Sequence, residues 1–128
     1  MPVLIDTQAF LWFVFGQQEL SQRGREALND RSVERYISIA SLWEIAIKHK
    51  LGKLHLNPPL DRFLTEQLAA TGVTILSIQP SHVFELDRLT LVHKDPFDRM
   101  LAAQARVEGC PIVSVDRIFD EYGLDRIW

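Results

Sequence analysis

Cysteine and long apolar runs are scarce in this chain of 128 residues. Cys110 is the only cysteine, so the chain can form neither an internal disulfide nor a cysteine-cluster metal site. The longest apolar run, from Ala9 to Phe15, is far shorter than the roughly 20 residues that a membrane-spanning helix needs. Residues 1–6 also lack the basic start of a secretory signal. We therefore expect a protein of the reducing cytoplasm with no membrane segment.

Positive charge is in deficit as well, because 14 basic residues stand against 17 acidic ones and leave a net charge of −3. A protein that binds nucleic acid only by neutralising phosphates is normally basic. If this chain acts on nucleic acid, its acidic residues therefore need an explanation of their own. The shares of hydrophobic residues, 47%, and of charged residues, 24%, are typical of a folded domain with a core. The length predicts one domain, residues 1–128.

Short apolar segments alternate with helical patterns along the chain. The pattern predicts strands at residues 3–5, 36–38, 73–76 and 112–115. It predicts helices at residues 7–15, 21–29, 40–51, 57–72, 80–89, 96–108 and 117–122, and leaves the terminal segment 125–128 unassigned. Strands of continuous apolar residues that are separated by helices favour a parallel sheet covered on both faces. The predicted fold class is therefore α/β, with three layers and a central parallel sheet.

Acidic residues follow two of the predicted strands. Asp6 comes directly after residues 3–5, and Asp116 comes directly after residues 112–115. In an open parallel sheet, the functional crevice lies beyond the carboxyl ends of the strands. Each of these acids, taken singly, is also explained as the N-cap of the helix that follows it.

Two further acids lie in apolar helices. Glu44 belongs to a helix that is apolar around most of its circumference, and Asp98 precedes an apolar helical segment. The helical stripe of Glu44 predicts a packed surface beside its carboxylate, formed by Ala40, Ile47 and Leu51. Ordinary roles compete here too, because Glu44 is spaced for a helical ion pair with Lys48. An acid in a first helical turn, such as Asp98, interacts favourably with the helix dipole.

Four carboxylates at one crevice would need a compensating charge. A carboxylate near a core requires a partner, and like charges in one site repel each other unless cations lie between them. Oxygen ligands without cysteine or clustered histidine suit Mg²⁺ or Mn²⁺ rather than zinc. Such cations activate water and stabilise charge on a phosphodiester, which would reconcile an acidic chain with nucleic-acid chemistry.

Four segments of the chain carry more specific sequence motifs. They are Leu4–Thr7, Ser41–Ile45, His93–Ala105 and Val113–Asp116. With them the chain resembles the PIN-domain ribonucleases, in particular the VapC-like toxins of bacterial toxin–antitoxin pairs. The block Asp95–Arg99 is the most specific of the matching pieces, and the matches span nearly the whole chain.

The resemblance implies a PIN-like fold and a metal-dependent endoribonuclease that cleaves RNA. It assigns the catalytic and metal-binding roles to Asp6, Glu44, Asp98 and Asp116. It also implies Mg²⁺ or Mn²⁺ as cofactor, a cognate antitoxin and a homodimer as partners, and Ser114 as a hydroxyl neighbour of the acids. Asp95 is read as a helix cap. Gln8 departs from the pattern, because relatives often carry histidine there.

Two alternatives remain open at this point. A PIN-type nuclease in RNA maturation would work without an antitoxin, and a neighbouring antitoxin reading frame separates these readings. A non-catalytic binding module could use the same scaffold. A nuclease assay with and without Mn²⁺ distinguishes such a module from an enzyme.

Two groups of residues carry further predictions. The apolar first helix has more aromatic residues than one core can accept, so a partner is expected to cover part of it: Phe10, Trp12, Phe13 and Phe15. The histidines show no ligand spacing and are predicted to have surface or packing roles: His49, His55, His82 and His93.

Overall fold

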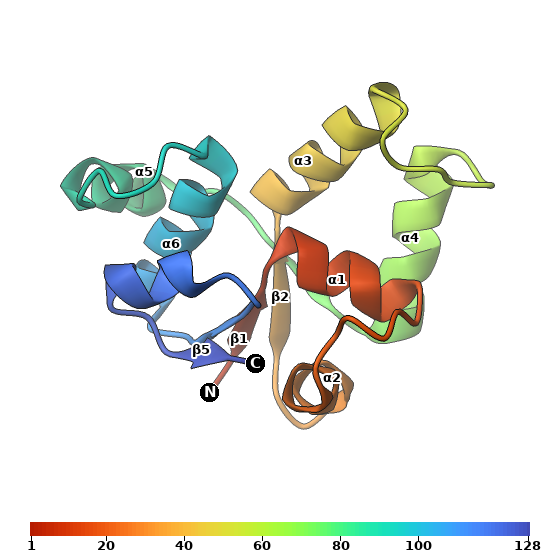
Figure 1. The fold of residues 1–128 in the computed structure, drawn as a ribbon, viewed down its shortest axis with the longest axis horizontal. Helices are drawn as coiled ribbons and strands as arrows, with labels where there is room; N and C mark the ends of the chain where they lie inside the picture. The colour runs from red at the N-terminus through yellow and green to blue at the C-terminus, as the bar shows by residue number, and fades with distance from the viewer.

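A computed structural model describes all residues, 1–128, and contains a five-stranded sheet (Figure 1). The strands are β1 (Val3–Ile5), β2 (Arg35–Ser38), β3 (Thr74–Leu76), β4 (Ile112–Val113) and β5 (Arg126–Ile127). Their order is β3-β2-β1-β4-β5, and every neighbouring pair is parallel. The predicted α/β class with a central parallel sheet is confirmed.

Helices cover both faces of the sheet (Figure 1). They are α1 (Thr7–Val14), α2 (Gln22–Asn29), α3 (Ile39–Lys50), α4 (Leu60–Thr71), α5 (Pro80–Arg88), α6 (Pro96–Glu108) and the 3-10 helix η1 (Arg117–Tyr122). Each predicted helix is found within a few residues of its predicted bounds. None of the helices has the length and apolar character that crossing a membrane would require.

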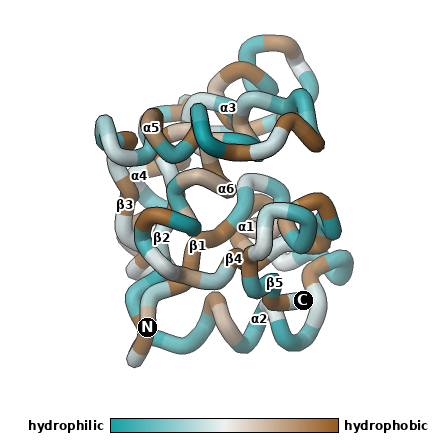
Figure 2. Tube along the Cα trace, turned by 90° about the vertical axis from the view of Figure 1, so that its left-hand side faces the viewer, coloured by the Kyte–Doolittle hydropathy of each residue, from teal (hydrophilic) through white to brown (hydrophobic).

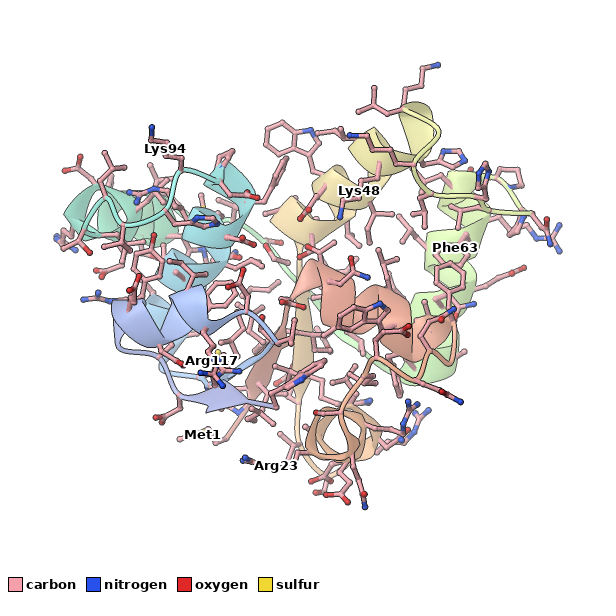
Figure 3. All side chains as sticks on the ribbon, in the orientation of Figure 1. Met1, Arg23, Lys48, Phe63, Lys94 and Arg117 are labelled. Atoms are coloured by element: carbon pink, nitrogen blue, oxygen red, sulfur yellow. The ribbon has the colours of Figure 1, made fainter.

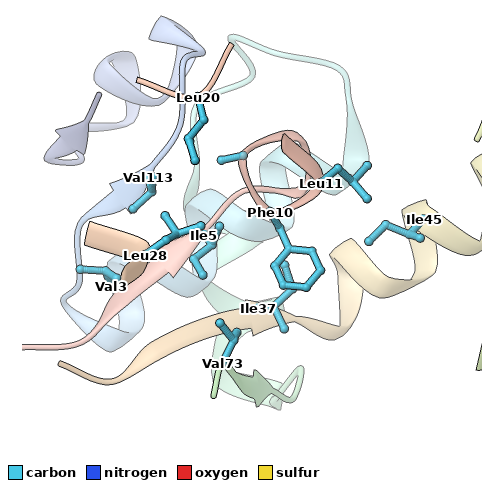
Figure 4. Close-up of a cluster of buried hydrophobic side chains, with 11 residues drawn as sticks. Val3, Ile5, Phe10, Leu11, Leu20, Leu28, Ile37, Ile45, Val73 and Val113 are labelled. Atoms are coloured by element: carbon cyan, nitrogen blue, oxygen red, sulfur yellow. The ribbon is translucent and has the colours of Figure 1, made fainter. Parts of the chain in front are cut away.

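Alternate residues of β1 supply the two hydrophobic cores, because successive side chains of a strand point to opposite faces. Val3 and Ile5 join Phe10 and other buried residues on one face, as Figure 4 shows. Leu4 packs with Leu101 and the rest of the second cluster on the other face. Figure 2 shows the hydrophobic character of β1 and β4 at the centre of the molecule. The sheet is therefore the middle of three layers, with one hydrophobic core between it and the helices on each face.

The sheet reverses its winding direction beside β1. From β1 the chain adds β2 and then β3 on one side, whereas β4 and β5 lie on the other side. Connections that leave in opposite directions open a crevice at the carboxyl ends of the strands between them. The topology therefore places this crevice beyond β1 and β4.

The C-terminal strands differ from the prediction. The predicted strand 112–115 is shorter in the structure, where β4 covers Ile112 and Val113. Ser114 still donates its backbone N–H to the Ile127 carbonyl, and its hydroxyl donates to the Asp6 carboxylate. The unassigned terminal segment contains β5, which pairs with β4 through Arg126 and Ile127. Two residues are too few to show an alternating pattern, so β5 had no local signal.

The chain itself covers most of the apolar surface of α1, more than predicted. Phe10 is fully buried, and Trp12 packs on Trp128 with ring centroids 5.8 Å apart. Phe15 remains 40% exposed although it stacks on Phe63. These contacts join residues far apart in the sequence, which explains why the helix pattern alone overestimated the uncovered surface.

On the outer face of α3, in contrast, more apolar surface is exposed than the sequence predicted. Ile47 and Leu51, which were predicted to pack beside Glu44, are exposed, Leu51 at 63%. Trp43 on the same face is 60% exposed and meets Phe97 edge-on, with ring centroids 5.1 Å apart. The prediction is confirmed for Ala40, which is buried, and is wrong for Ile47 and Leu51, because α3 lies at the rim of the crevice, where no further layer covers it (Figure 1).

Candidate functional site

Four elements bring the predicted acids to one crevice of about 250 Å³. Asp6 follows β1 and caps α1, and Asp116 follows β4 and caps η1. Asp98 lies in the first turn of α6, and Glu44 lies on α3. Asp6 and Asp116 therefore cap helices and also line the crevice, so the two predicted roles are compatible. Asp95 also lines the crevice.

Asp6 is the most deeply buried of these acids, with 7% of its surface exposed. Its Oδ1 accepts a hydrogen bond from the Ala9 backbone N–H at 2.7 Å, and its Oδ2 accepts one from the Ser114 hydroxyl. Burial raises the pKa of Asp6 to about 6, against the effect of these hydrogen bonds, and the charges of Asp98 and Asp116 raise it further.

Glu44 is held by its neighbours on both oxygens. Thr7 Oγ1 donates to Oε1 at 2.8 Å and lies 2.9 Å from Ser41 Oγ. Lys48 Nζ lies 3.2 Å from Oε2, which confirms the predicted ion pair. Lys48 is the one cationic side chain that lines the crevice, and Figure 3 shows it extending from α3 toward α1.

Asp98 is paired with a histidine. Its Oδ2 lies 3.0 Å from His93 Nε2. Burial raises the pKa of Asp98 to about 6, and the charges of Asp95 and Glu44 raise it further, while the His93 contact opposes the rise. Asp95 serves as the predicted cap of α6, since its Oδ1 accepts from the backbone N–H groups of Phe97 and Asp98.

The four predicted acids share the crevice but do not all converge on one point. The potential ligand atoms that lie within 4.8 Å of one another belong to His93, Asp95 and Asp98. Carboxylates without a cation between them repel, which keeps them apart. The donor set nevertheless fits Mg²⁺ or Mn²⁺, because the crevice is lined by carboxylate oxygens, the ligands that these ions prefer.

Two residues of the site were missed as functional candidates. His93 was predicted to have a surface or packing role, yet it contacts Asp98. Its position five residues before Asp98, inside the matched segment 93–105, was the available signal. Thr7, next to Asp6, contacts Glu44 from a helix remote in sequence, which no local pattern reveals. Gln8, the departure from the family pattern, also lines the crevice.

Asp6 predicts a pH dependence of stability in EDTA. Its ordinary pKa of 3.8 rises to about 6 on folding, so between these values the folded chain holds more protons than the unfolded one. The free energy of unfolding due to Asp6 therefore falls as pH rises through this range and stays constant above it. Asp6→Asn lacks this loss, so its melting temperature relative to wild type is expected to rise by roughly 10 °C from about pH 4 to pH 7.

Calorimetry across this pH range measures the difference. The exposed Asp87→Asn on α5 controls for the loss of one negative charge. A melting-temperature difference for Asp6→Asn that stays flat with pH would show that the Asp6 carboxylate is not held at a raised pKa.

A parallel sheet with a crevice of carboxylates at its switch point defines the class of the molecule, an α/β domain with an acidic site at the carboxyl ends of its strands. The PIN domain family model matches residues 3–124, so the chain belongs to the PIN domain family. A search of curated protein sequences finds no match.

Solved structures share this fold at low sequence identity. The VapBC2 complex from Rickettsia felis, bound to a promoter DNA fragment, contains a chain with a TM-score of 0.74 and 15% identity, over 100% of both chains. A chain of FitAcB from Neisseria gonorrhoeae gives 0.67 and 17%, over 97% of this chain and 95% of that one. A toxin–antitoxin complex from Klebsiella pneumoniae gives 0.60 and 17%, over 90% and 87%.

Proposed function

We propose that the protein is a Mg²⁺- or Mn²⁺-dependent endoribonuclease and the toxin of a toxin–antitoxin pair. One observation carries the proposal: Asp6, Glu44, Asp98 and Asp116 line a single crevice at the sheet switch point of a PIN domain. The similar solved structures belong to toxin–antitoxin complexes, which supports the choice of this branch.

In this proposal the four acids hold the cation and their neighbours hold the acids. When bound, a divalent cation neutralises the phosphodiester and activates the attacking water. Ser114 orients Asp6, and Thr7 orients Glu44, so two carboxylates keep their direction before substrate arrives. Lys48 supplies a positive charge at the rim of the crevice for a neighbouring phosphate.

Incubation with total RNA, followed by mapping of the cut ends, tests this function. Addition of water across a P–O bond leaves a phosphate monoester on one fragment and a hydroxyl on the other. We expect internal cuts with such ends, and none in an Asp98→Asn preparation purified in parallel. Ends that carry a 2′,3′-cyclic phosphate would contradict the proposal, because they arise when the ribose 2′-hydroxyl attacks. Absence of any cleavage would favour a binding module instead.

We propose that the antitoxin binds along α1. A cavity of about 320 Å³, lined in part by Leu11, Trp12 and Phe15, adjoins the acidic crevice and shares Gln8 and Lys48 with it. A segment lying in this cavity can therefore reach the crevice, where an Arg or Lys side chain would meet the carboxylates in place of the cation.

The exposed face of α3 supports the proposed homodimer. Its hydrophobic residues recur every four positions and so share one side of the helix: Ile39, Trp43, Ile47 and Leu51. Contiguous exposed apolar surface of this kind marks an interaction site, and a twofold dimer brings the same face of two copies together. Light scattering is expected to give twice the chain mass of 14.7 kDa, and Trp43→Asp is expected to give the monomer. A monomeric wild type would contradict this assignment.

A further inference from the structure

The loop between α5 and α6 brings a histidine to the acidic crevice. His93 Nε2 lies 3.0 Å from Asp98 Oδ2, and the two side chains are 31% and 23% exposed. We propose that His93 is a positioning residue that fixes the orientation of the Asp98 carboxylate for the cation. This inference rests on the metal centre of the proposed function.

The hydrogen bond restricts a side chain that would otherwise rotate. The terminal torsion of an aspartate is broad, so its carboxylate has no strong orientation of its own. Asp98 also lies close to the negative charges of Asp95 and Glu44, which oppose its charged form there. The contact with His93 occupies Oδ2 and leaves Oδ1 for a ligand. Hydrogen-bond partners of metal ligands act in this way, and their loss commonly weakens metal binding by about 10- to 100-fold.

Arg99 in turn fixes the loop that carries His93. Its Nη1 donates to the backbone carbonyls of Thr90 at 3.0 Å and His93 at 3.4 Å, and its Nη2 donates to that of Leu86 at 3.4 Å. The guanidinium therefore ties the end of α5 and the following loop to the first turn of α6. In the motif Asp95–Arg99, one residue caps the helix, one faces the crevice, and one holds the loop of the positioning histidine.

A direct role of His93 as a metal ligand is the competing reading. His93, Asp95 and Asp98 offer ligand atoms within 4.8 Å of one another. In the observed geometry, however, His93 Nε2 lies at hydrogen-bond distance from Asp98 Oδ2, and a ring nitrogen that donates its N–H to a carboxylate has no lone pair left for an ion. The observed geometry therefore favours the positioning role.

Calorimetric titration of the metal-free protein with Mn²⁺ tests the proposal without relying on activity. We expect His93→Ala to weaken Mn²⁺ binding by about tenfold. His93→Gln, whose amide can donate to Asp98, is expected to recover most of the affinity, and the exposed His55→Ala is expected to bind as wild type. If His93→Ala does not fold, His93→Phe takes its place, because phenylalanine keeps an aromatic ring but has no hydrogen-bond donor. Cleavage by the weakened variant should recover at higher Mn²⁺ concentration, unlike that of Asp98→Asn.

The outcomes separate this proposal from the proposed function. If wild type binds Mn²⁺ and both His93→Ala and His93→Phe bind it with the same affinity, the positioning role alone is overturned. Wild type that binds no Mn²⁺ would overturn the metal centre and this inference with it. Pulsed EPR of the bound Mn²⁺ is expected to show no coupling to a directly bound imidazole nitrogen, and such a coupling would establish the ligand role instead.

Discussion

Asp6→Asn is expected to lower the rate of RNA cleavage by about 1,000-fold. The substitution removes a charge that holds the cation, and the cation supplies several kcal/mol of transition-state stabilisation. Glu44→Gln, Asp98→Asn and Asp116→Asn are expected to do the same, since all four side chains line the crevice. The fold is expected to survive, because each variant removes one charge from a cluster of like charges. Initial rates on a defined RNA at saturating Mg²⁺ give the comparison.

Stability measurements make this test specific. The melting temperature of the metal-free variants is expected to equal or exceed that of wild type, most clearly for Asp6→Asn, whose carboxylate is buried at a raised pKa. Asp61→Asn, an exposed acid on α4, serves as the matched control and is expected to cleave normally. Variants that unfold, or that cleave RNA at the wild-type rate, would remove the corresponding acid from the site.

Phe15→Ala is expected to weaken antitoxin binding by about 30-fold, the effect of losing a buried aromatic anchor worth about 2 kcal/mol. Phe15, the C-cap residue of α1, stays exposed, and it lines the cavity beside the acidic crevice. Trp12→Ala is expected to act in the same direction, because Trp12 lines the same cavity. Cleavage by the isolated variants should remain, since neither side chain lines the acidic crevice.

Titration of each variant with the antitoxin encoded beside the toxin measures this effect. Phe84→Ala is a suitable control, because Phe84 is an exposed phenylalanine on α5 and lies outside that cavity. Circular dichroism of Trp12→Ala is the control for its fold, because this variant loses the Trp128 contact. Unchanged affinity in both α1 variants would exclude this helix from the antitoxin interface.

Residues with local signals were predictable from the sequence. Apolar runs such as residues 3–5 identified the strands, and Asp95 followed by Pro96 identified the start of α6. The acids at strand ends were candidates because parallel sheets place their sites there. Convergence of Asp6 and Asp116 followed from topology, since β1 and β4 are neighbours in the sheet.

Features that depend on distant contacts were not predictable. The Trp12–Trp128 contact covers α1 with the last residue of the chain, and β5 exists only through its pairing with β4. The role of Thr7 depends on two helices meeting at the crevice, which no local pattern shows, whereas His93 had only its position in the matched segment 93–105 as a signal. Exposure of Leu51 likewise depends on what lies beyond the rim of α3.

Removal and return of the metal tests the central claim most directly. Wild type is stripped with EDTA, dialysed, and assayed on RNA before and after addition of Mg²⁺ or Mn²⁺, with Asp116→Asn assayed in parallel. We predict that stripped wild type does not cleave, that either ion restores cleavage, and that Asp116→Asn stays inactive throughout. Full cleavage by the stripped protein would contradict a metal-dependent carboxylate centre.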